Sequence, residues 1–420
     1  MIRPENVMGA EPRGIMRYTL LQVLIFILFA LGPVVGNVIL VLQGAIGADF
    51  HVTPQEVLVV IPAFMFPFAI VQLFSGAISD MRGRIPIIVL GLLLFGAGNI
   101  LAAIATQLPI YAIANFLTGV GFGFINPVLI ALISDITPGQ NIPSKIGALS
   151  GVAMLGVGIG PLLAGLLVAY GWQTIYVLFA IISFTSCIMI LLVPRPPGKT
   201  HAKAGLKSLA IQFSQEWRRP VVLLMMVSAF LIAQGYLSIA IMTSTAVSGI
   251  ISPPIWGVVL LLMGLVGTVI AVISGNYSQK KEPALVFWIG GACLIISISI
   301  LLSLGDSLSV QNLPLLTIAL LIAGISGGTL FPAITSYSQV LSPSRRGALA
   351  GSLTACYFTG TALVPEFYRP LLGISIFWVF FAILCVAIIL LCVIALFYYA
   401  AKNQTSRSAP NVQSALQGMM

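Results

Sequence analysis

A short turn places an acid and a base, Asp80 and Arg84, between two apolar segments. The sequence from Gly76 to Pro86 reads GAISDMRGRIP, with Asp80 closing one apolar segment and Arg84 opening the next. An acid at the C-terminal end of a helix faces the negative end of the helix dipole, so it is stable there only beside a donor. We therefore expect a helix N-terminus or an arginine to lie against Asp80. A solvated turn charge is the alternative, but it leaves Gly76 and Gly83 unexplained.

The other ionisable residues lie at the ends of apolar segments. Residues 53–56 read TPQE, a capping-box sequence that predicts a structural role for Glu56. We expect the remaining acids and histidines to be edge or loop groups: Asp135 near Lys145, Glu366 three residues before Arg369, and His51 and His201. The five cysteines fall inside apolar segments without C-x-x-C spacing. A membrane enzyme would need clustered His, Asp or Glu, so we predict no enzyme activity, no metal site and no cofactor.

Long apolar runs must position these groups. Hydrophobic residues make up 59% of the 420 residues and charged residues 7%, which is too little polar surface for a soluble globule. We predict an all-α polytopic membrane protein with twelve transmembrane helices in two six-helix bundles. The expected spans are 19–45, 56–79, 85–106, 109–134, 146–169, 172–193, 220–247, 254–275, 284–304, 313–337, 347–365 and 373–400.

The basic residues predict how these spans are oriented. Of the 19 lysines and arginines, all but Arg369 fall on the side of the N-terminus. This bias predicts cytoplasmic termini in a cell membrane, and it accounts for the net charge of +9 without a nucleic-acid partner. The predicted parts are a cytoplasmic N-terminal segment (1–18), a first six-helix bundle (19–193), a cytoplasmic central loop (194–219), a second six-helix bundle (220–400) and a cytoplasmic tail (401–420).

The two halves repeat a short pattern. GFGFINP, ITP and GALSG follow one another around the fourth and fifth spans, and GGTLFP, LSP and GALAG around the tenth and eleventh. Pro127 and Pro138 thereby correspond to Pro332 and Pro343. An internal duplication is typical of secondary transporters.

The turn after the second span, together with twelve spans and a basic central loop, resembles the major facilitator superfamily over about residues 18–400. The family signature between helices 2 and 3 is G-x-L-x-D-x-x-G-R with further basic residues, where this chain has Met81 and Ile85. The resemblance implies that this loop latches the two halves in the outward-facing state. It assigns that conformational role to Gly76, Asp80, Gly83 and Arg84.

The fifth span contains GVGIGPLLAG. Its glycines make a face without side-chain bulk that lets another helix approach closely, and its proline places a kink there. Small-residue packing alone is one interpretation. The order G-x-x-x-G-P-x-x-A-G also resembles the fifth-helix motif of the superfamily's exporters, mainly drug:proton antiporters. The positions concerned are Gly156, Gly160, Pro161 and Gly165.

The fourth span departs from those antiporters. They carry an arginine there that takes part in proton coupling, whereas this chain has Asn115. The first span offers Asn37 and Gln43 in place of a membrane acid. Whether protons are a partner is therefore left open.

In this family the substrate lies near the midplane between the halves. Polar or aromatic residues expected at that depth are Asn37, Phe64, Phe68, Gln72, Asn115, Asn126, Gln234, Tyr236, Phe331 and Tyr357. Each alone is explained by helix packing, but together they describe a wide apolar cavity with neutral hydrogen-bonding groups.

We therefore expect a monomeric transporter that exports hydrophobic or weakly polar, drug-like small molecules through the bilayer by alternating access. An uncoupled facilitator, or a lipid or metabolite translocator of the same fold, is the alternative. A receptor or scaffold built on a transporter fold is the third possibility.

Overall fold

The structure is a computed structural model that describes residues 12–137, 142–192, 216–280, 283–341 and 346–405. Most of the predicted N-terminal segment, central loop and tail, together with Pro138 and Pro343, lies outside these residues. Every long element in the described ranges is a helix.

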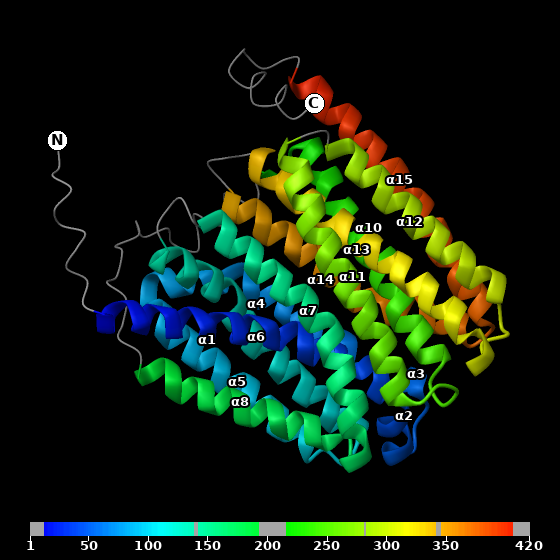
Figure 1. Cartoon of the computed structure of the whole chain (residues 1–420), viewed down its shortest axis with the longest axis horizontal. Coiled ribbons are helices and arrows are strands. Elements are labelled where there is room, and N and C mark those ends of the chain that lie inside the picture. Colours follow the sequence, from blue (N-terminus) through cyan, green and yellow to red (C-terminus); the bar gives the residue numbers. More distant parts are fainter. Residues whose placement is uncertain (1–11, 138–141, 193–215, 281–282, 342–345, 406–420) are drawn as a thin grey trace.

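The first half of the chain forms one group of helices, and the second half forms the other (Figure 1). The first group comprises α1 (Pro12–Asn37), α2 (Ile39–Phe50), α3 (Pro54–Val57), α4 (Val60–Arg82), α5 (Arg84–Ala103), α6 (Leu108–Ile136), α7 (Ile142–Leu167) and α8 (Gln173–Leu192). The second comprises α10 (Pro220–Ala246), α11 (Pro253–Lys280), α12 (Pro283–Leu304), α13 (Leu313–Leu341), α14 (Arg346–Leu372) and α15 (Ile376–Thr405).

The first two spans are each interrupted once, although the sequence predicts single helices over 19–45 and 56–79. α1 and α2 are separated at Val38, and α3 and α4 at Leu58 and Val59. The backbone keeps right-handed helical angles at Val38, Leu58 and Val59, so each pair still runs as one span. Pro62 explains the second break, because it has no N–H to donate to the carbonyl of Leu58.

Eleven helices in the described residues are long and apolar enough to cross a bilayer. The twelfth, α14, has 27 residues but carries Glu366, Arg369 and several hydroxyl groups. It packs between α10 of its own bundle and α4 of the other. A helix enclosed in this way can be more polar than one that faces lipid.

The bundles meet along a few helix pairs. α4 packs against α14, α7 against α11, and α2 against α10. Within each bundle the neighbours correspond: α5 packs on α6 and α8, while α12 packs on α13 and α15. α6 and α13 both have 29 residues and carry Pro127 and Pro332 at the same place, which agrees with the predicted duplication.

The two ends of the molecule differ in charge. Arg82, Arg84, Lys145 and Arg219 lie at one end, which we call the basic end; the sequence predicts that it is cytoplasmic. The α2–α3 turn and the turn between α10 and α11 lie at the opposite end.

Candidate functional site

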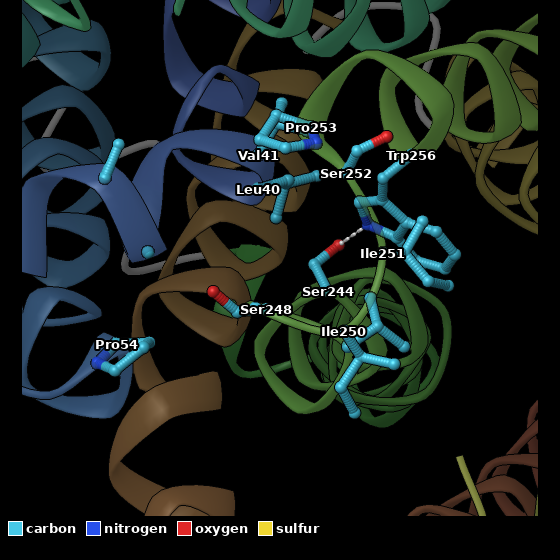
Figure 2. A pocket seen from close by; sticks show the side chains of 14 residues that line it. Leu40, Val41, Pro54, Ser244, Ser248, Ile250, Ile251, Ser252, Pro253 and Trp256 are labelled. Carbon is cyan, nitrogen blue, oxygen red and sulfur yellow. Dashed lines mark hydrogen bonds between the residues drawn. The ribbon is translucent and has the colours of Figure 1, made fainter. Parts of the chain in front are cut away.

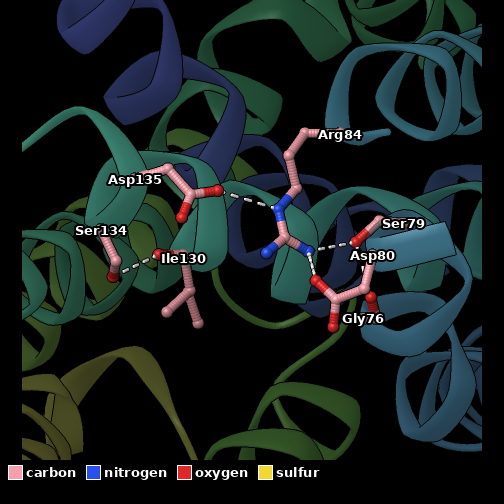
Figure 3. A network of polar contacts seen from close by, with 7 residues as sticks. All are labelled: Gly76, Ser79, Asp80, Arg84, Ile130, Ser134 and Asp135. Carbon is pink, nitrogen blue, oxygen red and sulfur yellow. Dashed lines mark hydrogen bonds and ion pairs between the residues drawn. The ribbon is translucent and has the colours of Figure 1, made fainter. Parts of the chain in front are cut away.

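Arg84 joins two acids at the basic end (Figure 3). Its Nη1 lies 2.5 Å from Oδ1 of Asp80, and its Nε lies 3.1 Å from Oδ2 of Asp135 at the end of α6. Nη1 also donates to Oγ of Ser79 at 2.6 Å, and that hydroxyl donates to the carbonyl of Gly76. The expected donor to Asp80 is therefore an arginine from the same turn.

The turn between α4 and α5 requires a glycine. Gly83 has φ of 92°, a conformation that strains other residues, and it separates α4 from α5 by a single residue. This tight turn brings Arg84 back over the end of α4, where the guanidinium is mostly shielded from solvent, with 13% of its side chain exposed. A planar guanidinium can serve both carboxylates at once.

Lys145 and Asp135 each have a partner on another helix. Lys145 donates to Oε1 of Gln22 on α1 at 3.0 Å. Arg84 pairs with Asp135, because the end of α6 lies over the α4–α5 turn. The ion pairs of Asp80, Arg84 and Asp135 described here all lie within the first bundle.

The glycine face of α7 serves two helices. A Cβ on Gly160 would lie 2.3 Å from the carbonyl oxygen of Val34 on α1, and Gly156 meets the same helix. Gly165 faces the other bundle, where its Cβ would lie 2.5 Å from the carbonyl oxygen of Pro253 on α11. The motif therefore allows close packing inside the first bundle and also between the bundles.

Five of the predicted midplane residues lie in or beside one row of aromatic rings. Phe64 and Phe68 stack along α4, with ring centroids 6.2 Å apart. Phe68 meets Phe358 of α14 at 4.5 Å, across the boundary between the bundles. The row continues through Tyr357 to Phe331 on α13, at 5.5 Å and then 4.1 Å.

Tyr236 reaches the same region from α10. It is buried, and its ring occupies the space that a side chain on Gly327 of α13 would fill. The aromatic row and Tyr236 together present neutral π-systems and phenol groups.

Three of the residues predicted for the pocket use their side-chain amides to donate hydrogen bonds to backbone carbonyl groups. The side-chain nitrogens of Asn37 and Asn115 donate to carbonyls one turn earlier in their own helices, both within 2.8 Å. Gln234 donates at 2.6 Å to the carbonyl of Gly360, which ties α10 to α14. Phe64 and Asn115 also line a small gap of about 10 Å³, which is space for about one water molecule.

Gln72 and Asn126 differ from these three residues in their hydrogen bonding. Nε2 of Gln72 on α4 and Oδ1 of Asn126 on α6 are buried and have no hydrogen-bond partner among the described residues. Buried polar atoms of this kind are uncommon and call for a partner. A transported molecule or a water could supply it.

The sequence alone does not identify three further candidate residues, Phe122, Phe358 and Gly158. Phe122 packs against Phe68 with ring centroids 5.1 Å apart, and Phe358 packs against Phe68 from the other bundle. Gly158 lies against Leu261 of α11. Each of them adjoins a predicted residue or motif, but the sequence alone does not tell which face of its helix turns toward a partner.

The remaining acids behave as edge groups where their contacts are described. Thr53 and Glu56 form the predicted capping box, with Oε2 of Glu56 2.7 Å from the backbone nitrogen of Thr53. Asp306 accepts from Ser375 and from the backbone of Ile376 in a turn at the opposite end. No group of three His, Cys, Asp or Glu side chains that could hold a metal occurs in the described part of the chain.

Comparisons with known proteins agree with this architecture. The family model of the Major Facilitator Superfamily matches residues 24–365. The quinolone resistance protein NorA of Staphylococcus aureus (strain MSSA476) is 23% identical over 362 residues, which cover 84% of this chain and 89% of NorA. The uncharacterized MFS-type transporter YceJ of Bacillus subtilis (strain 168) is 23% identical over 322 residues, covering 75% of this chain and 80% of YceJ.

Solved structures share the fold at lower identity. The nucleoside transporter NupG superposes with a TM-score of 0.74 at 12% identity, over 90% of this chain and 99% of NupG. A bacterial homolog of the human lysosomal transporter Spinster, inward-facing and occupied, gives 0.71 at 16% identity, over 94% and 98%. One of these proteins is named for nucleoside transport and another for quinolone resistance, so the substrate must be argued from this chain's own residues.

Proposed function

We propose that this chain, which belongs to the Major Facilitator Superfamily, exports neutral hydrophobic or weakly polar small molecules from the cell by alternating access. In this mechanism two bundles rock around a midplane site, which opens to one side of the membrane at a time. The chain is a polytopic membrane transporter; the export direction and the substrate class are the proposal.

The observation that carries the proposal is the neutral aromatic row across the bundle boundary. Phe68 belongs to the first bundle, whereas Phe358, Tyr357 and Phe331 belong to the second. A molecule bound there would touch both bundles. Aromatic walls with a few neutral polar groups suit a drug-sized apolar molecule, and Gln72 and Asn126 each offer an unpartnered polar atom.

Two further features favour export of drug-like molecules. The α7 motif around Gly160 and Pro161 resembles that of the superfamily's exporters, and the quinolone resistance protein NorA is similar over most of both chains. An acidic or basic substrate would leave its charge unpaired beside the aromatic row, because the stretches that contain the row, residues 57–79, 307–344 and 347–365, have no Asp, Glu, Lys or Arg.

A second candidate, an uncoupled facilitator, is favoured by the surroundings of Asp135. A proton carrier must be reached from each side of the membrane in turn as access alternates, but Asp135 lies at the basic end in an ion pair with Arg84. Asn115, which takes the place of the antiporters' arginine, has its amide bound to the carbonyl of Tyr111. The alternative of a receptor or scaffold would show no transport at all.

Reconstituted protein can test the proposal. Proteoliposomes would be loaded with uncharged coumarin dyes, and release would be compared with that from protein-free liposomes. Phe68→Ala should reduce the protein-dependent release, while Phe74→Ala, on the same helix but 41% exposed, should leave it near the wild-type rate. Equal rates in both variants would reject the aromatic row as the binding site, and release no faster than from protein-free liposomes would reject transport of these dyes.

A further inference from the structure

A cavity of about 550 Å³ lies at the opposite end of the molecule, between α2 and the turn that follows α10 (Figure 2). The residues Leu40, Val41, Gly44 and Ala45 of α2 form one wall. The end of α10, the turn after it and the start of α11 form the other, from Ser244 to Trp256. Pro54, the first residue of α3, closes one side. The cavity therefore has walls from both bundles.

Hydrogen bonds hold the walls of the cavity in place. Nε1 of the buried Trp256 donates to Oγ of Ser244 at 2.8 Å, which fixes the indole against α10 (Figure 2). The turn is held by bonds from the backbone nitrogens of Ile250 and Ile251 to the carbonyl of Val247, at 2.9 and 3.1 Å. Leu40, Val41, Val247 and Ile251 are buried in the lining, whereas Ile250 and Ser252 are exposed at its rim.

The chemistry of the lining selects the occupant. None of the 14 lining residues is ionisable, and most are aliphatic, proline or tryptophan. Hydroxyl groups of Ser244, Ser248 and Ser252 supply the polar contacts. Ser244 accepts from Trp256 but has no acceptor for its own O–H among the described residues. The volume falls in the usual range for drug-sized ligands, about 300–1,000 Å³.

The cavity depends on the closure of this end. Thr245 on α10 donates to Oε1 of Gln43 on α2 at 2.9 Å, and both side chains are buried beside the cavity. A Cβ on Gly44 would lie 2.6 Å from Oγ of Ser248, so the two bundles approach closely here. If this end opens, the two walls move apart. A ligand that touches both walls therefore binds the closed state better and stabilises it.

We propose that this α2–α10 cavity binds neutral lipophilic small molecules that carry a hydrogen-bond acceptor, and that its occupation holds the opposite end closed and inhibits transport. The inhibition rests on the proposed alternating-access function, whereas the binding does not. The site is distinct from the midplane row, so occupants of the two sites need not be the same molecule.

The test uses purified full-length protein in lipid nanodiscs, without its five native cysteines and with Ser252→Cys as a reporter at the rim. Nile red, a neutral lipophilic dye with one carbonyl acceptor, is the probe, and the rate of maleimide labelling is measured. Nile red at ten times its dissociation constant should slow labelling about ten-fold, because only about a tenth of the sites remain empty. Ile374→Cys, exposed elsewhere at the same end, should label at an unchanged rate.

A variant whose new side chain fills the cavity, paired with a variant that leaves it open, tests the site. Ala45→Trp places an indole in the lining and should abolish protection of Ser252→Cys, while Ala45→Ser should keep it. Elution as a single peak in size exclusion and an unchanged rate at Ile374→Cys verify that the variants are folded. Protection that persists in Ala45→Trp would overturn the site. Slow labelling that Nile red does not change would mean that lipid fills the cavity, which would also overturn it.

Transport then separates the two proposals. Compared with the same protein without Nile red, Nile red should reduce coumarin release in wild-type and Ala45→Ser proteoliposomes but not in a Ser244→Ala variant that no longer shows protection. Protection without any protein-dependent release would leave the cavity as a binding site and contradict the transport proposal. Release that Nile red does not slow, in protein that shows protection, would overturn the inhibitory role.

Discussion

Gly165→Ala should shift the balance between the two conformations without unfolding either bundle. The added Cβ would lie 2.5 Å from the carbonyl oxygen of Pro253, whereas ordinary contacts begin at 3.4 Å. α7 and α11 must then separate by about 1 Å at this level, and overpacking of this kind costs about 1–3 kcal/mol. The cost applies only where the two helices touch, which is in the closed state described here. The ratio of closed to open molecules should therefore fall about 5- to 150-fold.

The assay is a distance measurement by electron paramagnetic resonance. Spin labels at Ile104→Cys and Ile374→Cys, both highly exposed residues at the opposite end of different bundles, report its opening. Gly165→Ala should increase the population at the longer distance. Gly147→Ala adds the same methyl group to α7, where nothing lies within 4 Å, and should match the wild type. Identical distributions in Gly165→Ala and Gly147→Ala, with both proteins folded, would refute the reasoning.

Asp80→Asn should lower dye transport while changing the unfolding free energy by no more than about 1 kcal/mol, since this ion pair is partly exposed; unchanged transport would favour a solvated turn charge. Gly160→Leu should lower thermal stability and transport more than Leu162→Ala does, because its side chain would collide with α1 within the same bundle; normal transport by Gly160→Leu would argue against a close contact. Gln234→Ala should lower the unfolding free energy by about 0.5–1.5 kcal/mol, since it removes a buried hydrogen bond that ties α10 to α14, with little change in substrate affinity; a large affinity loss at wild-type stability would place Gln234 in the substrate site instead.

Local signals in the sequence predict local structure well. The capping box of Thr53 and Glu56 and the turn at Gly83 depend on residues a few positions apart, and the structure contains both. The twelve-helix architecture follows from apolar length, and Pro127 and Pro332 mark equivalent helices. Even here the breaks at Val38 and Val59 escape prediction, because an interrupted helix within one apolar run leaves the hydropathy unchanged.

Contacts between distant helices are harder to predict. In a soluble helix the apolar stripe indicates the buried face, but a membrane helix is apolar on its lipid face as well. The sequence therefore gives no indication that Asp135 pairs with Arg84, or that Gly160 and Gly165 face different helices. For the same reason the sequence does not indicate a role for Phe358, although it does for its neighbour Tyr357.

Transport of an uncharged coumarin dye into proteoliposomes, with and without an imposed pH gradient of one unit, shows whether the protein moves neutral molecules and whether that movement depends on protons. We expect protein-dependent equilibration whose rate changes less than about twofold with the gradient, because the described midplane residues include no group that titrates near neutral pH. Asn115→Ala should then affect substrate affinity more than pH dependence. Absence of protein-dependent movement would contradict a transporter of neutral lipophilic molecules. Accumulation driven by the gradient and abolished by Asp135→Asn or Glu366→Gln would contradict the uncoupled mechanism and identify the proton carrier.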